Sequence, residues 1–246
     1  MDTQVLILAG GLGKRMGGNI PKVLTRLRDK PLIRYTLDTV KKSKICERPS
    51  IVVGSMAELI ERELGPEYEY IFQKEQLGTG HAVMVSKPKL SGKSRNVLVL
   101  YGDQPFITPD AIQSLVEAHN RNNSILSMMT VAVQDFQDWR ESFYGFGRII
   151  RDKEGNLASI IEFKDCSEEQ KNIKEVNPSF FCFDSEWLWQ NIDMIKNDNA
   201  QKEYYLTDLL ALAISQGKKV SSIRVDPKVA FGINTPQQLS WAESFL

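Results

Sequence analysis

Short apolar runs alternate with amphipathic segments through the first half of the chain. Contiguous apolar and β-branched residues predict buried strands at 5–8, 50–54, 70–72, 96–101 and 125–133. Between these runs apolar side chains recur at helical spacing, which predicts helices over 31–40, 56–64, 80–87 and 109–119. Because strand–helix alternation is typical of βαβ units, we expect an α/β fold with a Rossmann-like, mainly parallel sheet flanked by helices.

The second half has a different pattern, in which short strands and turns predominate. Residues 147–151 and 157–162 predict a hairpin around the Glu154-Gly155-Asn156 turn. Further strands are expected at 176–183 and 220–225, and further helices at 185–195, 204–216 and after the cap Thr235. We expect a single domain, 1–246, in which an α/β half, 1–133, is followed by a smaller β lobe and a C-terminal segment, 134–246.

The first predicted strand runs into a glycine-rich loop, Leu8-Ala9-Gly10-Gly11-Leu12-Gly13-Lys14-Arg15-Met16, which continues to Pro21-Lys22. Glycine lets backbone N–H groups approach an anion closely, and the cations behind it can neutralise the anion's charge. Neither usual phosphate motif fits, because Met16 replaces the third glycine of the dinucleotide fingerprint and Arg15 replaces the Ser or Thr of the P-loop. The loop is therefore a candidate triphosphate site that includes Lys22, and the alternative is a flexible, solvated surface turn.

Three polar loops, which begin at Ala9, Gln73 and Gly102, each follow the carboxyl end of a predicted strand. Ligands bind beyond these strand ends in such sheets, so we expect the three loops to share one cleft. Asp103 lies just past a buried strand, where a carboxylate can share Mg²⁺ with phosphate oxygens, unless it only closes a turn. Asn234 offers a second, neutral oxygen, and its alternative role is that of a turn or cap residue.

The second loop contains the amides Gln73 and Gln76, which have the acceptor and donors needed to read a base edge. Gly78 permits close approach of a base or ribose. Thr79 could instead be the cap of the following helix. His81 is expected to be a first-turn helix residue rather than a catalyst.

Composition narrows the class of protein further. Lys plus Arg and Asp plus Glu both number 31, so no overall charge attracts nucleic acid or an anionic membrane. The three cysteines form no Cys-x-x-Cys pair and only two histidines are present, which argues against disulfide and zinc frameworks. Without a signal peptide pattern or an apolar run of membrane-spanning length, we expect a cytoplasmic protein.

Several segments together resemble one family, the sugar-phosphate nucleotidyltransferases, over roughly residues 4 to 240. The glycine loop with Pro21-Lys22-Val23-Leu24 resembles the family signature. Six further segments are similar to the uridylyltransferase domain of bifunctional N-acetylglucosamine-1-phosphate uridylyltransferase/acetyltransferases: 73–82, Tyr101-Gly102-Asp103-Gln104-Pro105, Gly147-Arg148-Ile149, Glu162-Phe163-Lys164-Asp165, 203–208 and Gly232-Ile233-Asn234.

The resemblance implies a nucleotide-binding half, 1–133, and a sugar-binding lobe with a metal-binding C-terminal segment, 134–246. The implied substrates are UTP and a sugar 1-phosphate, with Mg²⁺ as cofactor. Uridine would contact Leu8, Ala9, Gly10, Gly11, Gln73, Gln76, Gly78 and Thr79. The sugar would contact Tyr101, Gly102, Gly147, Glu162, Asn177, Tyr205 and Thr207. Arg15 and Lys22 would act on the phosphates as catalytic cations, and Asp103 and Asn234 would bind the metal.

Two departures from the family pattern bear on these expectations. Asn177-Pro178-Ser179 stands where the family usually has Asn-Thr-Gly, beside the implied sugar site. The chain ends at Leu246 without hexapeptide repeats, so we expect neither the acetyltransferase β-helix domain nor the trimer it forms, and the oligomeric state stays open. The alternatives are the same chemistry with another hexose 1-phosphate, dTTP or CTP, and an inactive regulatory subunit that binds nucleotide sugars.

Overall fold

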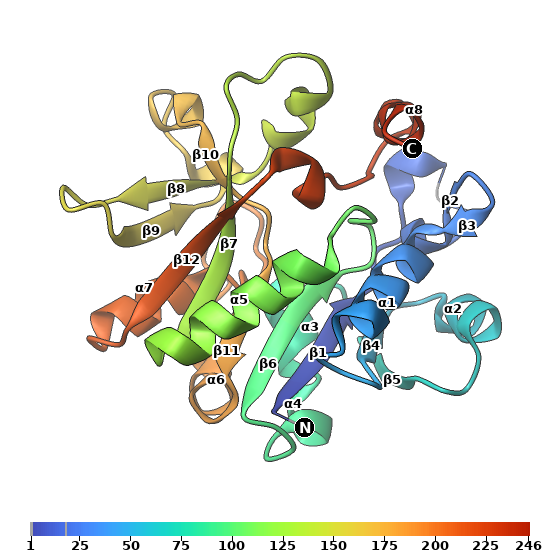
Figure 1. The fold of residues 1–246 in the computed structure, drawn as a ribbon, viewed down its shortest axis with the longest axis horizontal. Coiled ribbons are helices and arrows are strands. Elements are labelled where there is room, and N and C mark those ends of the chain that lie inside the picture. Colours follow the sequence, from blue (N-terminus) through green and yellow to red (C-terminus); the bar gives the residue numbers. More distant parts are fainter. Residues whose placement is uncertain (1, 18) are drawn as a thin grey trace.

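The structure, a computed structural model, describes residues 2–17 and 19–246, and one twisted sheet runs through this part of the chain (Figure 1). Four neighbouring strands at one end of the sheet pair in parallel. In spatial order they are β5 (Glu69–Phe72), β4 (Ser50–Val53), β1 (Thr3–Leu8) and β6 (Asn96–Tyr101). These pairings confirm the predicted βαβ arrangement of the first half.

The same sheet continues into the second half of the chain. Beyond β6 the order is β11 (Phe181–Asp184), β7 (Leu126–Ala132), β10 (Glu175–Asn177), β8 (Gly147–Arg151) and β9 (Leu157–Ile161), all paired antiparallel. Strand β12 (Val220–Val225) pairs with β7 in parallel. A separate two-stranded ribbon, β2 (Arg26–Leu27) and β3 (Lys30–Pro31), packs beside the C-terminal helix α8 (Pro236–Ser244).

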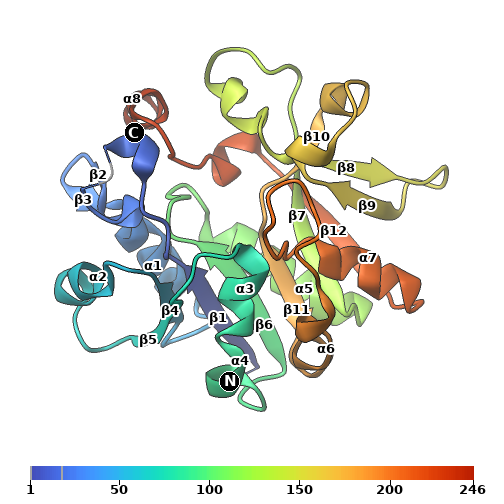
Figure 2. The ribbon, with the colours of Figure 1, turned by 180° about the vertical axis from the view of Figure 1, so that it is seen from behind.

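Helices cover both faces of the sheet because its central strands are apolar on both sides. Val5 and Ile7 of β1 belong to a core with α1 (Leu32–Ser43), α2 (Ala57–Leu64) and α5 (Pro109–Asn122). Leu6 and Leu8 point to the opposite core, formed with α3 (Thr79–Met84), α4 (Lys87–Leu90), α6 (Ser185–Asn191) and α7 (Asp208–Ser215). Figure 1 shows α1 and α5 on one face, and Figure 2 shows α3 and α4 on the other. The expected α/β fold is therefore confirmed.

Three sequence predictions need correction. The single strand expected at 176–183 is two strands, because Pro178 has no N–H to donate and Ser179 adopts φ +69°, outside the β region. The helix expected at 204–216 begins only at Asp208, since the Tyr204 backbone pairs instead with the 77–80 loop. The helix expected at 80–87 closes before Pro88, as predicted, but it already ends at Met84, and Pro88 lies in the first turn of a second short helix, α4, where its missing N–H costs nothing.

A fourth difference lies after β11, where α6 ends at Asn191 and a 3-10 turn, Ile192–Met194, completes the helix expected over 185–195. Elsewhere the predicted ends are close. Thr108 and Thr235 cap α5 and α8 through their side chains, as expected. None of the helices in the described part of the chain combines the length and the apolar character that a bilayer crossing requires.

Candidate active site

A cavity of about 250 Å³ lies at the carboxyl ends of β1 and β6. The glycine loop, the loop after β5 and the loop after β6 all contribute to its wall, so the predicted convergence of these loops is confirmed. Its lining residues are Leu8, Ala9, Gly10, Gly11, Lys22, Val23, Gln73, Gln76, Gly78, Thr79, Ala82, Tyr101, Asp103 and Glu203. Every residue expected to contact the nucleotide is among them.

The glycine loop folds back over Lys22. The Lys22 backbone N–H donates to the Gly11 carbonyl at 3.1 Å, and Gly13 adopts φ +59°. A Cβ atom on Gly13 would lie 3.0 Å from the Lys22 Cβ and 3.1 Å from its Cα, so a larger residue would push the loop off the lysine. Arg15 lies in the short 3-10 turn Lys14–Met16, is exposed, and is not part of the cavity wall.

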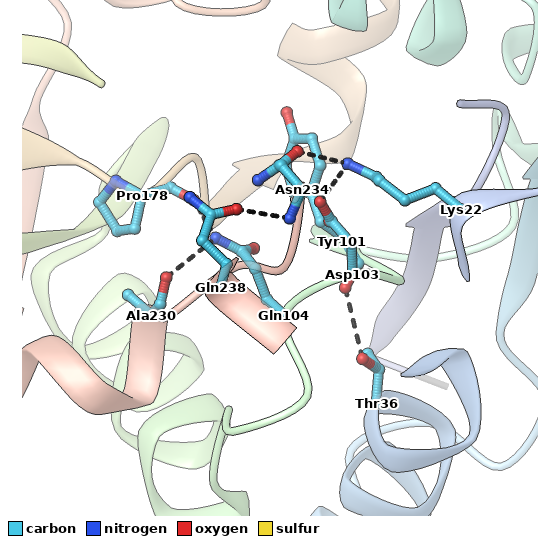
Figure 3. Close-up of polar contacts among 9 residues, drawn as sticks. All are labelled: Lys22, Thr36, Tyr101, Asp103, Gln104, Pro178, Ala230, Asn234 and Gln238. Carbon is cyan, nitrogen blue, oxygen red and sulfur yellow. Dashed lines mark hydrogen bonds and ion pairs between the residues drawn. The ribbon is translucent and has the colours of Figure 1, made fainter. Parts of the chain in front are cut away.

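Lys22 joins the two residues expected to bind metal (Figure 3). Its ammonium forms an ion pair with the Asp103 carboxylate and donates to Asn234 Oδ1 at 2.8 Å. The Lys22 and Asp103 side chains are 19% and 12% exposed, so bulk solvent screens the pair only in part. One carboxylate oxygen and one amide oxygen thus converge on a cationic nitrogen at the edge of the cavity.

The backbone around Asn234 holds its side chain in this place. The Asn234 N–H donates to Gln238 Oε1 at 2.6 Å, and the Ile233 N–H donates to the Asp103 carbonyl at 2.9 Å. Because Thr235 is the cap of α8, the Asn234 side chain is free to face Lys22. The alternative that Asn234 serves as the helix cap is therefore wrong.

On the nucleotide side, internal contacts fix the loop amides. Gln73 is buried, and its Nε2 lies 3.3 Å from the Gly78 carbonyl and 3.1 Å from His81 Nδ1. Gly78 adopts φ +106°, which favours glycine. Thr79 does not cap α3; its Oγ1 accepts a hydrogen bond from the Leu206 N–H at 3.3 Å. The loop after β5 is thus tied to the segment that precedes α7.

The residues expected at the sugar form a second group, which adjoins the cavity through Tyr101 rather than lining it. Thr207 Oγ1 donates to Glu162 Oε1 at 2.9 Å, and a Cβ on Gly147 would lie 3.4 Å from Glu162 Oε2. Burial is the main cause that raises the pKa of Glu162 above its ordinary value, and nearby Asp208 adds to it. Burial likewise raises the pKa of the Tyr101 phenol, which faces Thr79 and Ser179.

Two other residues of this group are buried. Asn177 pairs with Gly147 across β10 and β8, and its Oδ1 accepts a hydrogen bond from the Ser179 N–H at 2.8 Å. The Tyr205 hydroxyl accepts from Gln201 Nε2 at 3.0 Å. Gly102 packs against Val23, whose Cγ1 would be 2.9 Å from an added Cβ, so its place is beneath the cavity wall.

Sequence reasoning missed two residues at this site. Glu203 lines the cavity, although it belongs to a motif recognised for Tyr205 and Thr207. No spacing in the sequence distinguishes Glu203 from an ordinary surface glutamate. Gln104 was noted only as the neighbour of Asp103, and it is buried between the C-terminal segment and the turn that follows β10.

Comparison with known proteins agrees with a nucleotide site on this fold. Residues 5–160 match the model of the MobA-like NTP transferase domain, so the chain belongs to this family of nucleotidyltransferases. Among curated proteins it is 38% identical over 247 residues to the bifunctional protein GlmU of Clostridium novyi, covering 100% of this chain and 52% of that protein. It is 37% identical over 235 residues to GlmU of Clostridium acetobutylicum, covering 95% and 50%. The chain thus spans about half the length of the curated relatives it matches.

Two solved structures share the fold at low sequence identity. A UDP-glucose pyrophosphorylase complexed with UDP-glucose superposes with a TM-score of 0.78 at 18% identity, covering 100% of this chain and 98% of that one. A Bacillus anthracis structure named as a glucose-1-phosphate thymidylyltransferase superposes with a TM-score of 0.76 at 20% identity, covering 99% and 94%.

Proposed function

We propose that this nucleotidyltransferase transfers UMP from UTP to a sugar 1-phosphate, N-acetylglucosamine 1-phosphate, and releases pyrophosphate. The observation that carries the proposal is the Lys22 ammonium, held by Asp103 and Asn234 at the edge of the cavity formed by the glycine loop. A cation held beside a glycine-rich loop can offset the negative charge of a triphosphate and of the sugar phosphate that must approach it. The identity to GlmU proteins over the whole chain supports the choice of UTP and of this sugar.

The reaction requires positioning and charge stabilisation more than covalent chemistry. An oxygen of the sugar phosphate attacks the α-phosphorus of UTP, the new P–O bond forms, and the bond to the pyrophosphate oxygen breaks. The Lys22 ammonium would offset negative charge that develops on the transferring group, in a site that already keeps it partly from water. Arg15, exposed at the mouth of the loop, would meet the outer phosphates.

The donor atoms around Lys22 fit Mg²⁺. Asp103 Oδ2 and Asn234 Oδ1 already converge on one cationic group, and hard oxygen donors are the ligands that Mg²⁺ prefers. Among the described residues no cluster of three His, Cys, Asp or Glu side chains could hold a metal alone. Magnesium usually completes such a sparse protein set with water and substrate phosphates. When bound there, it would neutralise phosphate charge.

The sugar would bind on the far side of Tyr101, against Gly147, Glu162, Asn177 and Thr207. The Thr207 hydroxyl donates to the Glu162 carboxyl group, so the two groups that would bind the sugar hydroxyls are held in a fixed arrangement. A Cβ on Gly147 would lie 3.0 Å from Ile160 Cγ2 and 3.4 Å from Glu162 Oε2, so a larger residue there would crowd the Glu162 carboxyl group. Tyr205 closes the group from the segment before α7.

Pyrophosphate release across a substrate panel tests the proposal. UTP, dTTP and CTP are combined with N-acetylglucosamine 1-phosphate, glucose 1-phosphate and glucosamine 1-phosphate, each with Mg²⁺. We expect UTP with N-acetylglucosamine 1-phosphate to give the highest kcat/KM. Asp103→Ala and Lys22→Ala should each lower turnover at least about 100-fold while the thermal unfolding transition is retained. Tight UDP-sugar binding without turnover of any pair would instead identify a regulatory subunit.

A further inference from the structure

The side chain of Gln104 joins segments that are far apart in the sequence (Figure 3). It follows Asp103 in the loop after β6 and is 5% exposed. Its Nε2 donates to the Pro178 carbonyl at 3.0 Å and lies 3.4 Å from the Ala230 carbonyl. These carbonyls are 74 and 126 residues away along the chain. Nothing in the proposed reaction assigns a role to this amide.

The orientation of the amide follows from its neighbours. Two backbone carbonyl oxygens face one end of the Gln104 side chain, and only the NH₂ group can donate to both. The other end, Oε1, is buried and has no hydrogen-bond partner among the described residues. A buried polar atom without a partner costs free energy, so the two N–H contacts must compensate for it.

Each segment that meets at Gln104 carries a residue of the proposed site. Asp103 directly precedes it, and the Asp103 carbonyl accepts from the Ile233 N–H, next to Asn234. Pro178 lies between Asn177 and Ser179, in the turn that ends β10. Ser179 there adopts a left-handed conformation that costs an ordinary residue about 1–2 kcal/mol. Contacts must therefore hold this turn. Gln104 donates to the Pro178 carbonyl, and within the turn the Ser179 N–H donates to Asn177 Oδ1 at 2.8 Å and Asn177 Nδ2 donates to Ser179 Oγ at 3.4 Å.

We infer that Gln104 is a positioning residue that fixes the turn Asn177–Ser179 relative to Asp103 and Asn234. The inference rests on the proposed function, because it assigns the turn to the sugar phosphate side of the reaction. The Gln104 side chain is not part of the wall of the nucleotide cavity, and its two hydrogen bonds go to segments outside that wall. Loss of its amide should therefore weaken the productive binding of the sugar phosphate and leave the binding of UTP unchanged.

The variant Gln104→Met tests this, because methionine keeps the length and the apolar body of glutamine and removes both donors. The matched control is Gln113→Met on α5, where Nε2 also donates to one backbone carbonyl, that of Ser43, at 3.0 Å. We expect Gln104→Met to raise KM for the sugar 1-phosphate by about tenfold, the equivalent of one or two lost hydrogen bonds. KM for UTP should change by less than about twofold, and Gln113→Met should change neither constant.

Hydrogen exchange gives a second readout that needs no activity. In Gln104→Met the amide of Ser179 should exchange at least about tenfold faster than in the parent chain, with helix α5 unchanged. Equal changes in both KM values, or an unchanged Ser179 amide, would overturn the inference. If the parent chain turned over no substrate pair, the proposed function would fail, and the exchange measurement would still decide the role of Gln104. Should Gln104→Met not fold, Gln104→Leu provides the same comparison.

Discussion

Replacing Lys22 by methionine should tighten the binding of a divalent cation to the nucleotide-free protein while it lowers turnover. In the structure the Lys22 ammonium occupies the two oxygens that would hold the metal, Asp103 Oδ2 and Asn234 Oδ1. A single and a double positive charge about 4 Å apart repel by roughly 8 kcal/mol at an effective dielectric constant of 20. The ammonium and the metal therefore cannot share these oxygens, and the ammonium must leave when the metal binds.

The size of the change in metal affinity follows from the contacts of the Lys22 ammonium that the metal must replace. Hydrogen bonds to charged groups contribute about 1.5–3 kcal/mol each, and the low exposure of Lys22 and Asp103 limits screening. Methionine is nearly as long as the lysine stem and makes no such contact. If displacing the Lys22 ammonium costs the metal the free energy of one such hydrogen bond, removing the ammonium should lower the Kd for the metal about 10- to 100-fold.

Mn²⁺ is a convenient substitute for Mg²⁺, since its free concentration can be followed by electron paramagnetic resonance without any nucleotide. The control is Lys30→Met, because Lys30 forms an ion pair with Asp38 whose side chains are 35% and 54% exposed, away from the cavity. At saturating Mn²⁺ the Lys22→Met enzyme should still be about 100- to 1,000-fold slower than the parent, as expected when one charge-stabilising donor is lost. An unchanged or weaker Mn²⁺ affinity would refute the reasoning, because the ammonium would then not compete with the metal.

Three further predictions concern stability and pH. Arg148 is fully buried, and its Nη2 donates to the Tyr144 and Lys171 carbonyls at 2.9 and 3.0 Å, so Arg148→Met should lower the free energy of unfolding in urea by about 2–4 kcal/mol. An unchanged urea midpoint would contradict that role. Burial lowers the pKa of His119 to about 4, whereas an unfolded histidine titrates near 6.5; the stability this contributes is present above pH 6.5 and is lost as the pH falls toward 4, by about 3 kcal/mol. His119→Gln should flatten the pH dependence of the urea midpoint over that window, and a parallel curve for the variant would rule the histidine out. Lys44 follows the last residue of α1 and adopts φ +57°, so Lys44→Gly should raise the melting temperature by an amount equivalent to about 0.5–1 kcal/mol; a lower melting temperature would contradict this reading of the backbone geometry.

The strands and helices of the first half were predictable because their signals are local. The apolar run of β6 is bounded by polar residues, and Thr108-Pro109 begins α5 where a cap and a first-turn proline are expected. The turn after β10 was not predictable in the same way. Phe180 and Phe181 continue the apolar pattern of a strand, but Pro178 has no N–H to donate and Ser179 adopts φ +69°, so the strand is broken there.

The residues of the candidate site could be predicted from the sequence, but the contacts between them could not. Asp103 follows the carboxyl end of a strand. Because the carboxyl ends of parallel strands lie at the same edge of a sheet, Asp103 is expected near the glycine loop. No local pattern shows that Lys22 reaches Asn234, since the two are 212 residues apart. Gln104 gave no signal at all, because a buried glutamine is recognised only by the carbonyls around it.

Lys22 connects the glycine loop to the oxygens of Asp103 and Asn234. A Cβ on Gly13 would lie 3.0 Å from the Lys22 Cβ, and the Lys22 N–H donates to the Gly11 carbonyl. The far end of the same lysine contacts Asp103 and Asn234. A ligand that binds to the loop therefore also affects the position from which the ammonium reaches the two oxygens. In the proposed reaction this would couple triphosphate binding to release of the oxygens for Mg²⁺, since the phosphates offer the ammonium a new anionic partner when it leaves Asp103.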